Sequence, residues 1–196
     1  MIRKFRRNEN FDASGLGGTV TASGVFVPDD LLSVSLSVNV NIAPAAANTG
    51  YIIQKFMPYS VSFTKASVNE PTGVIGTNVY YSIYDSRGNL ILTERFATLA
   101  APAVLSGTLI QGTPFIPAGL LYWVLAVDVP PVTGTICAVP TVAVDLTTRN
   151  FNSVKNGSIV GMLSGGLMPT SFNPASIVGA TGGHVGSNAC AEMYLE

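Results

Sequence analysis

Charge is scarce in this chain of 196 residues: only 11% of them are charged, with 10 basic and 11 acidic side chains and a formal net charge of -1. A nucleic-acid-binding protein usually carries a large basic excess, so this balance argues against nucleic acid as the main ligand. A disordered chain would contain fewer hydrophobic residues than the 47% found here. The composition therefore predicts one folded domain, and such a weakly charged surface favours an oligomer over a monomer.

Cysteine and histidine are also rare, with two cysteines and one histidine. Two cysteines are too few for a secreted disulfide scaffold, and neither Cys137 nor Cys190 lies in a CxxC motif, so buried reduced thiols are expected. His184 lies in a glycine-rich stretch, and the chain has no Gly-x-Ser-x-Gly motif that would supply a nucleophile. The sequence predicts no enzyme activity, metal site or cofactor, and it places His184 at a surface or an interface.

Long hydrophobic runs are missing as well. The longest one, at residues 119–127, stops at Asp128, far short of the ~20 residues of a membrane-spanning helix. No apolar segment follows the basic start of the chain, as a secretory signal peptide would require. We therefore expect no membrane partner and synthesis in a cytoplasm.

Helical patterns are nearly absent, whereas 20 glycines and 12 prolines punctuate short runs of β-branched and aromatic residues. At residues 32–40, apolar side chains alternate with Ser and Asn, which is the period of a half-buried strand. This pattern predicts an all-β fold, an antiparallel β-sandwich of the jelly-roll type. The expected strands are 31–42, 51–56, 59–68, 77–84, 90–96, 103–110, 120–129 and 134–145, with weaker ones near 158–163 and 189–195.

The composition divides the chain into an extended N-terminal arm, residues 1–30, and a β-sandwich domain, residues 31–196. Residues 147–188 are rich in Gly, Pro and Asn and are predicted to be mostly loop, which is typical of a functional loop or of a segment over a neighbour. The arm begins with a basic cluster around an apolar residue: Arg3, Lys4, Phe5, Arg6 and Arg7. This cluster has three interpretations: a tether that docks on an acidic partner surface, a contact with nucleic acid, or a tail that improves solubility.

Two turns are well specified by the sequence. Asp85 and Gly88 predict the turn of a hairpin between residues 78 and 96, because Asp accepts hydrogen bonds from nearby amides and Gly adopts a positive φ. Pro117 and Gly119 predict a second turn that leads into a long buried strand, in which Trp123 is expected to be core.

These two segments, Ile83-Tyr-Asp-Ser-Arg-Gly-Asn-Leu90 followed by Ile116-Pro-Ala-Gly-Leu-Leu-Tyr-Trp-Val124, resemble a jelly-roll domain of tailed-bacteriophage surface proteins. The closing segment 189–195 is similar to the last core strand of such domains. The resemblance covers about residues 50–196. It implies a trimeric, non-enzymatic protein on the virion surface and carries over no ligand residues.

The first hypothesis is therefore a capsid decoration, or cement, protein that forms a homotrimer and binds the major capsid protein through its arm. The alternative is a tail-fibre or receptor-binding protein that recognises a host glycan, with Tyr84, Tyr122 and His184 as contact residues. A more distant alternative is a glycan-cleaving enzyme, which needs two carboxyl groups beside one sugar bond. The candidates for such a pair are Asp85, Glu94, Asp128 and Asp145.

Overall fold

The computed structural model describes residues 19–21, 25–27, 38–42, 46–57, 59–70, 73, 75–129, 137–141, 157–179 and 193–196. Within these residues the chain forms short β-strands, and the one helical element is a 3-10 turn, η1, at Pro174–Ser176. No helix in this part of the chain is long and apolar enough to cross a membrane. The predicted all-β class is confirmed.

The strands vary from two to nine residues in length. In chain order they are Thr19–Thr21 (β1), Val25–Val27 (β2), Val38–Ile42 (β3), Thr49–Met57 (β4), Ser60–Ser62 (β5), Ala66–Glu70 (β6), Asn78–Asp85 (β7), Leu90–Ala97 (β8), Ala103–Ser106 (β9), Thr108–Gly112 (β10), Phe115–Ile116 (β11), Gly119–Val127 (β12), Cys137–Thr141 (β13), Gly157–Val160 (β14), Val178–Gly179 (β15) and Met193–Leu195 (β16).

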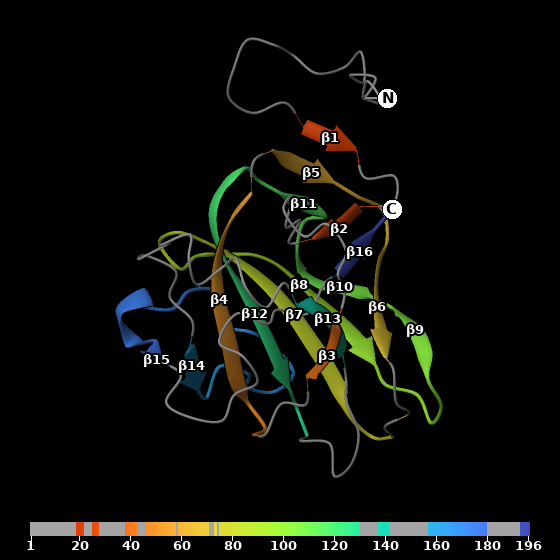
Figure 1. The fold of residues 1–196 in the computed structure, drawn as a ribbon. Helices are drawn as coiled ribbons and strands as arrows, with labels where there is room; N and C mark the ends of the chain where they lie inside the picture. The colour runs from red at the N-terminus through yellow and green to blue at the C-terminus, as the bar shows by residue number, and fades with distance from the viewer. Residues whose placement is uncertain are drawn as a thin grey trace.

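The largest sheet has the strand order β10-β8-β7-β12-β4-β14-β15, and all its pairings are antiparallel. Three smaller sheets have the orders β1-β5-β11, β2-β16-β6-β9 and β13-β3. Figure 1 shows the long strands of the large sheet side by side, with the short strands β1, β5 and β11 beyond one end of it. The first two small sheets supply side chains to the same core as the large sheet, which makes the fold a β-sandwich.

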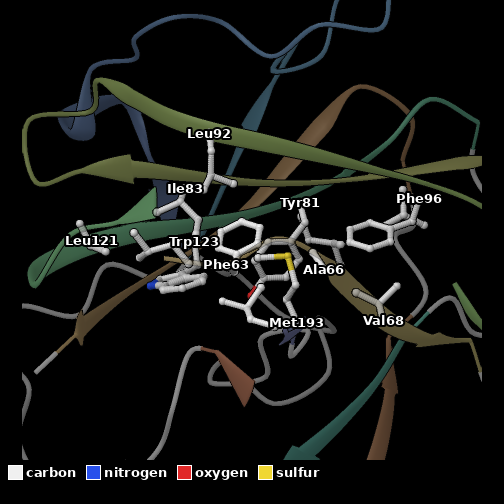
Figure 2. Packing of buried hydrophobic residues seen from close by; sticks show 14 of the residues in the cluster. Phe63, Ala66, Val68, Tyr81, Ile83, Leu92, Phe96, Leu121, Trp123 and Met193 are labelled. Carbon is white, nitrogen blue, oxygen red and sulfur yellow. The ribbon is translucent and has the colours of Figure 1, made fainter. Parts of the chain in front are cut away.

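The main core lies on the inner face of the large sheet (Figure 2). Alternation along β12 places Trp123 on this face, where it is completely buried and meets Tyr81 of β7 edge to face, with the ring centroids 5.9 Å apart. Val68 of β6 and Met193 of β16 close the core from the opposite side. The prediction that Trp123 is a core residue is confirmed.

A second apolar cluster lies on the outer face of the same sheet. Tyr84, Tyr122 and Val124 contribute to it from the sheet, while Met162 and Met168 contribute from the segment that follows β14. We call residues 161–177 the covering segment, because they close this outer face. The described part of the predicted 147–188 loop therefore packs over the sheet of its own chain.

Both predicted turns are present. In the β7–β8 hairpin, Gly88 has a φ of 87°, and Asp85 Oδ1 accepts hydrogen bonds from the amides of Arg87 and Asn89 at 2.9 and 2.8 Å. Gly119 has a φ of 122° at the start of β12. These conformations follow from local chemistry, since a positive φ favours glycine and a short carboxylate satisfies nearby amides.

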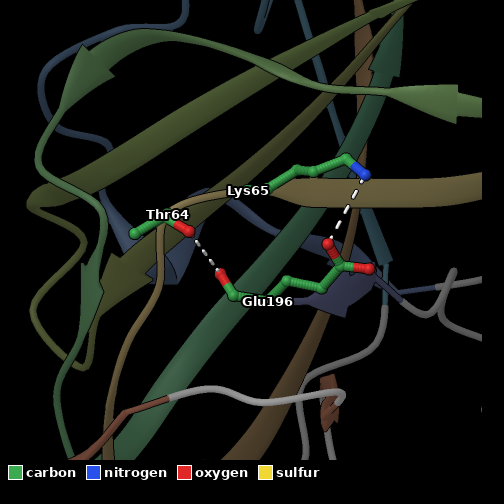
Figure 3. A network of polar contacts seen from close by, with 3 residues as sticks. All are labelled: Thr64, Lys65 and Glu196. Carbon is green, nitrogen blue, oxygen red and sulfur yellow. Dashed lines mark hydrogen bonds and ion pairs between the residues drawn. The ribbon is translucent and has the colours of Figure 1, made fainter.

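The structure divides two of the expected strands. The chain leaves β5 after Ser62 and enters a different sheet as β6, and between them the amides of Thr64 and Lys65 donate to the carbonyl of Glu196 at 2.6 and 3.0 Å. Figure 3 shows the Thr64 hydroxyl and the Lys65 ammonium bound to the same residue. The second division is at Gly107, where the chain crosses from β9 in one sheet to β10 in the other.

Two short strands come from the part of the chain that the sequence assigns to the arm. β1 pairs in parallel with β5, and β2 pairs in antiparallel with the C-terminal strand β16. Residues 19–21 and 25–27 are thus attached to the domain. The basic cluster at the start of the arm lies outside the described residues.

Candidate functional site

Asp85 stabilises the turn between β7 and β8. Its carboxylate accepts from the amides of Arg87 and Asn89 and, at 2.8 Å, from the Asn89 side chain. Partial burial alone would raise the pKa of Asp85, but the hydrogen bonds from Asn89 and Arg87 outweigh it and leave this pKa below its ordinary value. The carboxylate is therefore ionised, and both of its oxygens accept hydrogen bonds from residues of its own turn.

Asp128 is similarly engaged at the other end of β7. Its Oδ1 accepts from the amides of Asn78 and Val129, both at 2.8 Å, and its Oδ2 accepts from the Asn78 side chain at 2.6 Å. The pKa of Tyr80 is raised by burial and by the negative charge of Asp128, against a smaller opposing effect of Arg95. Asp128 thus holds the end of β12 against the start of β7.

Three of the candidate carboxylates, Asp85, Asp128 and Glu94, do not form a glycosidase pair within one chain. Asp85 ends β7 and Asp128 binds Asn78 at its start, so a strand of eight residues separates them. At about 3.3 Å per residue this is roughly 20 Å, whereas such a pair needs about 5–9.5 Å. Glu94 lies on the neighbouring strand β8, opposite Tyr81 in the middle of β7, and it is buried on the inner face. Asp145 lies outside the described residues.

Tyr84 and Tyr122 are not surface residues, and the prediction that they are exposed contacts is wrong. They are 0% and 3% exposed, because Phe172 of the covering segment packs edge to face on both rings, at centroid distances of 4.9 and 5.3 Å. The Tyr84 hydroxyl also donates to the carbonyl of Pro169 at 3.0 Å. Burial raises the pKa of both phenols. The aromatic pair is part of the second core.

The remaining predicted site residues lie outside the described residues. These are Arg3, Lys4, Phe5, Arg6, Arg7 and His184, and the same holds for Cys190. Within the described residues, no group of three or more His, Cys, Asp or Glu side chains is placed to hold a metal ion.

The candidate site that the structure does describe is apolar. Ile75, Leu99 and Val129 are 80%, 51% and 50% exposed, and they lie in loops at the end of the large sheet toward which β12 runs in Figure 1. We call these three residues the apolar end. They are large hydrophobic side chains on the outside of the domain, a feature that marks interaction surfaces when the side chains form a contiguous patch.

Hydrogen bonds at Thr77 hold the three loops of the apolar end together. The Thr98 amide and hydroxyl donate to the Thr77 carbonyl at 3.2 and 2.8 Å, and the Thr77 hydroxyl donates to the Val129 carbonyl. The Leu99 amide donates to the carboxylate of Glu70, which is fully buried, at 3.1 Å. The polar groups are thus satisfied beneath the surface while the apolar side chains stay exposed.

The apolar end was not predicted from the sequence, although a signal for it is present there. Residues 71–77 and 97–104 contain no charged side chain, even though both are loop-like stretches with Pro or Gly. A loop without charge is unusual at a free surface. That signal becomes visible only when the two stretches and Val129 are known to be neighbours.

The fold defines the chain as an antiparallel β-sandwich with three exposed hydrophobic side chains on the loops at one end. No family model, no curated protein and no solved structure matches this chain. A relation to phage surface proteins is therefore a proposal.

Proposed function

We propose that this protein is a non-enzymatic structural protein of a tailed-bacteriophage virion, a trimeric capsid decoration protein that assembles through its apolar end. The N-terminal arm attaches it to the major capsid protein. The single observation that carries the assembly part of this proposal is the exposure of Ile75, Leu99 and Val129 on loops held together by hydrogen bonds.

Burying these side chains against other copies supplies a driving force for assembly. A fully buried side chain of this size contributes about 1.5–3 kcal/mol relative to an exposed one. Residues 71–77 and 97–104 carry no charge, and the carboxylate of Asp128, which precedes Val129, already accepts hydrogen bonds from Asn78 and Val129, so little desolvation cost opposes the contact. The loops are also organised before contact, which lowers the entropy lost when an interface forms.

The attachment part of the proposal rests on the arm. Arg3, Lys4, Arg6 and Arg7 surround Phe5, and they make up four of the 10 basic residues of the chain. Cationic side chains around one apolar residue suit an acidic protein surface with an apolar depression, where Phe5 serves as the anchor. A virion surface built of many copies would supply such a site on each capsid subunit.

Deletion of residues 1–12 tests the attachment. The shortened chain is expected to keep its fold and its oligomeric state but to lose binding to undecorated capsids of the phage that encodes it. Cosedimentation with capsids measures the binding, and the double change Arg6→Ala and Arg7→Ala serves as the milder variant. Normal decoration by the shortened chain would contradict the role of the arm.

Tyr84 and Tyr122 are buried, so these two side chains do not support glycan recognition. The receptor-binding alternative nevertheless makes an opposite prediction. It requires the purified chain to adsorb to host cells and surface polysaccharide to compete, whereas a decoration protein adsorbs to capsids and not to cells.

A further inference from the structure

Glu94 is a carboxyl group in the apolar core. It lies between Leu92 and Phe96 on β8, and both of those residues belong to the inner core, so alternation places Glu94 on the same inner face. Its side chain is buried, with the whole residue 3% exposed. Neither the sandwich fold nor the proposed assembly requires a carboxyl group at this position.

The Glu94 carboxyl lies against the crossover between the two sheets. A Cβ on Gly107 would lie 2.7 Å from Glu94 Oε2 and 2.9 Å from a ring carbon of Phe96, so only glycine leaves room for the side chain there. The Gly107 amide donates to the carbonyl of Ala66 at 2.8 Å, which ties the crossover to β6. Glu94 therefore contacts the point at which the chain passes from β9 to β10.

Nothing on the neighbouring strands compensates a charge on Glu94. From β7 the titratable group that faces it is Tyr81, its cross-strand partner. β6, β7, β9, β10 and β11 contain no Lys, Arg or His, and Arg95 on β8 itself is exposed and points to the opposite face. The other acid, Glu70 at the end of β6, accepts from the Leu99 amide. Within the part of the chain that the structure describes, the Glu94 carboxyl has no ion pair or hydrogen bond, and the slight exposure of the residue leaves its oxygens at the edge of the core.

We propose that Glu94 is a pH-sensitive element of the sandwich: while it is protonated the β9–β10 crossover stays closed on β8, and when it ionises the crossover opens to admit water. An ionised carboxylate without a partner in an apolar core is costly, and Gly107 lies directly against Glu94 Oε2, so movement of the crossover there would hydrate the carboxylate. This inference goes beyond the proposed function and does not depend on it.

The direction of the effect follows from the pKa of Glu94, which burial raises from 4.5 to about 7. In the open state the carboxyl is solvated and returns to its ordinary value. The closed state is therefore fully favoured below about pH 4.5, and its advantage is lost as the pH rises to about 7, with no further loss above that. Over this window the equilibrium constant for opening rises on the order of tenfold per pH unit.

Amide hydrogen exchange of the full chain at pH 5, 6, 7 and 8 tests the proposal. After correction for the intrinsic exchange rate at each pH, protection at residues 103–109 is expected to fall about tenfold per unit up to about pH 7. Glu94→Gln keeps the shape of the side chain without its charge and is expected to abolish this dependence. The matched control, Glu70→Gln, changes a buried carboxylate that already has a partner, and it should retain the dependence.

A second measurement covers the case in which Glu94→Gln fails to fold. The carbon-13 shift of the Glu94 carboxyl in the unaltered protein should report titration near pH 7. Titration near the ordinary value of a glutamate would overturn the proposal. Protection at residues 103–109 that is independent of pH, or equally dependent on it in Glu94→Gln, would overturn it as well.

Discussion

Tyr84 and Tyr122 occupy paired positions on the outer face of the large sheet, and Phe172 covers both of them. Alternation along a strand predicts which face a side chain takes, but nothing local to either tyrosine says that a residue far along the chain will close that face. Asp85, Gly88 and Trp123 were predictable for the opposite reason. Turn chemistry and an unbroken apolar strand are local properties of the sequence.

The hydroxyl of Tyr84 permits a test of the closed outer face at this scale. Tyr84→Phe removes the hydrogen bond to the Pro169 carbonyl and leaves that carbonyl unsatisfied in a partly buried place. We expect a loss of about 1 kcal/mol in the free energy of unfolding, measured by urea denaturation. Tyr122→Phe is the matched control, because its ring meets the same Phe172. A change below about 0.5 kcal/mol is expected for it, and equal losses in the two variants would contradict the assignment.

Among the structural elements, the strands of the large sheet were largely predictable and the covering segment was not. Expected strands at 77–84, 90–96 and 120–129 correspond closely to β7, β8 and β12. The covering segment has few regular hydrogen bonds of its own, and its glycines and prolines are typical of an exposed loop. Its burial depends on Met162, Met168 and Phe172 reaching a sheet face that the sequence does not reveal as available.

Gln111 of β10 links the covering segment to the edge of the sheet. Its side-chain amide donates to the Met168 carbonyl, and its oxygen accepts from the Met168 amide, each at 2.9 Å. Gln111→Ala removes both bonds, so hydrogen exchange at the amides of Leu167 and Met168 is expected to accelerate about tenfold while the β7 and β12 amides stay protected. Exchange that accelerates equally throughout the sheet would show that the segment is not a separate unit.

For the whole molecule, the sequence indicated an assembling protein through its scarcity of charge but did not locate the surface. The uncharged stretches 71–77 and 97–104 are far from Val129 in sequence. The register of β7 against β8 and β12 brings all three together. The apolar end is thus a property of the fold. The attachment role of the arm is a prediction of the sequence alone.

A charge at the apolar end should disrupt the assembly without unfolding the chain. Leu99→Glu places a carboxylate on a side chain that is 51% exposed, so the single domain tolerates it while a contact between copies does not. The expected result is a shift of the oligomer toward single chains by sedimentation. Val160→Glu, at a position 85% exposed on β14, is the control and should leave the assembly intact. Dissociation of the oligomer by both substitutions would contradict the assignment of the apolar end as the interface.

The mass of the purified chain in solution, measured by light scattering at micromolar concentration, decides whether the protein assembles with copies of itself. One chain has a mass of 20.4 kDa. We expect the mass of three chains, which are held together by the apolar end. A mass of one chain across the whole concentration range would contradict self-assembly, and it would leave Ile75, Leu99 and Val129 exposed to water without a role.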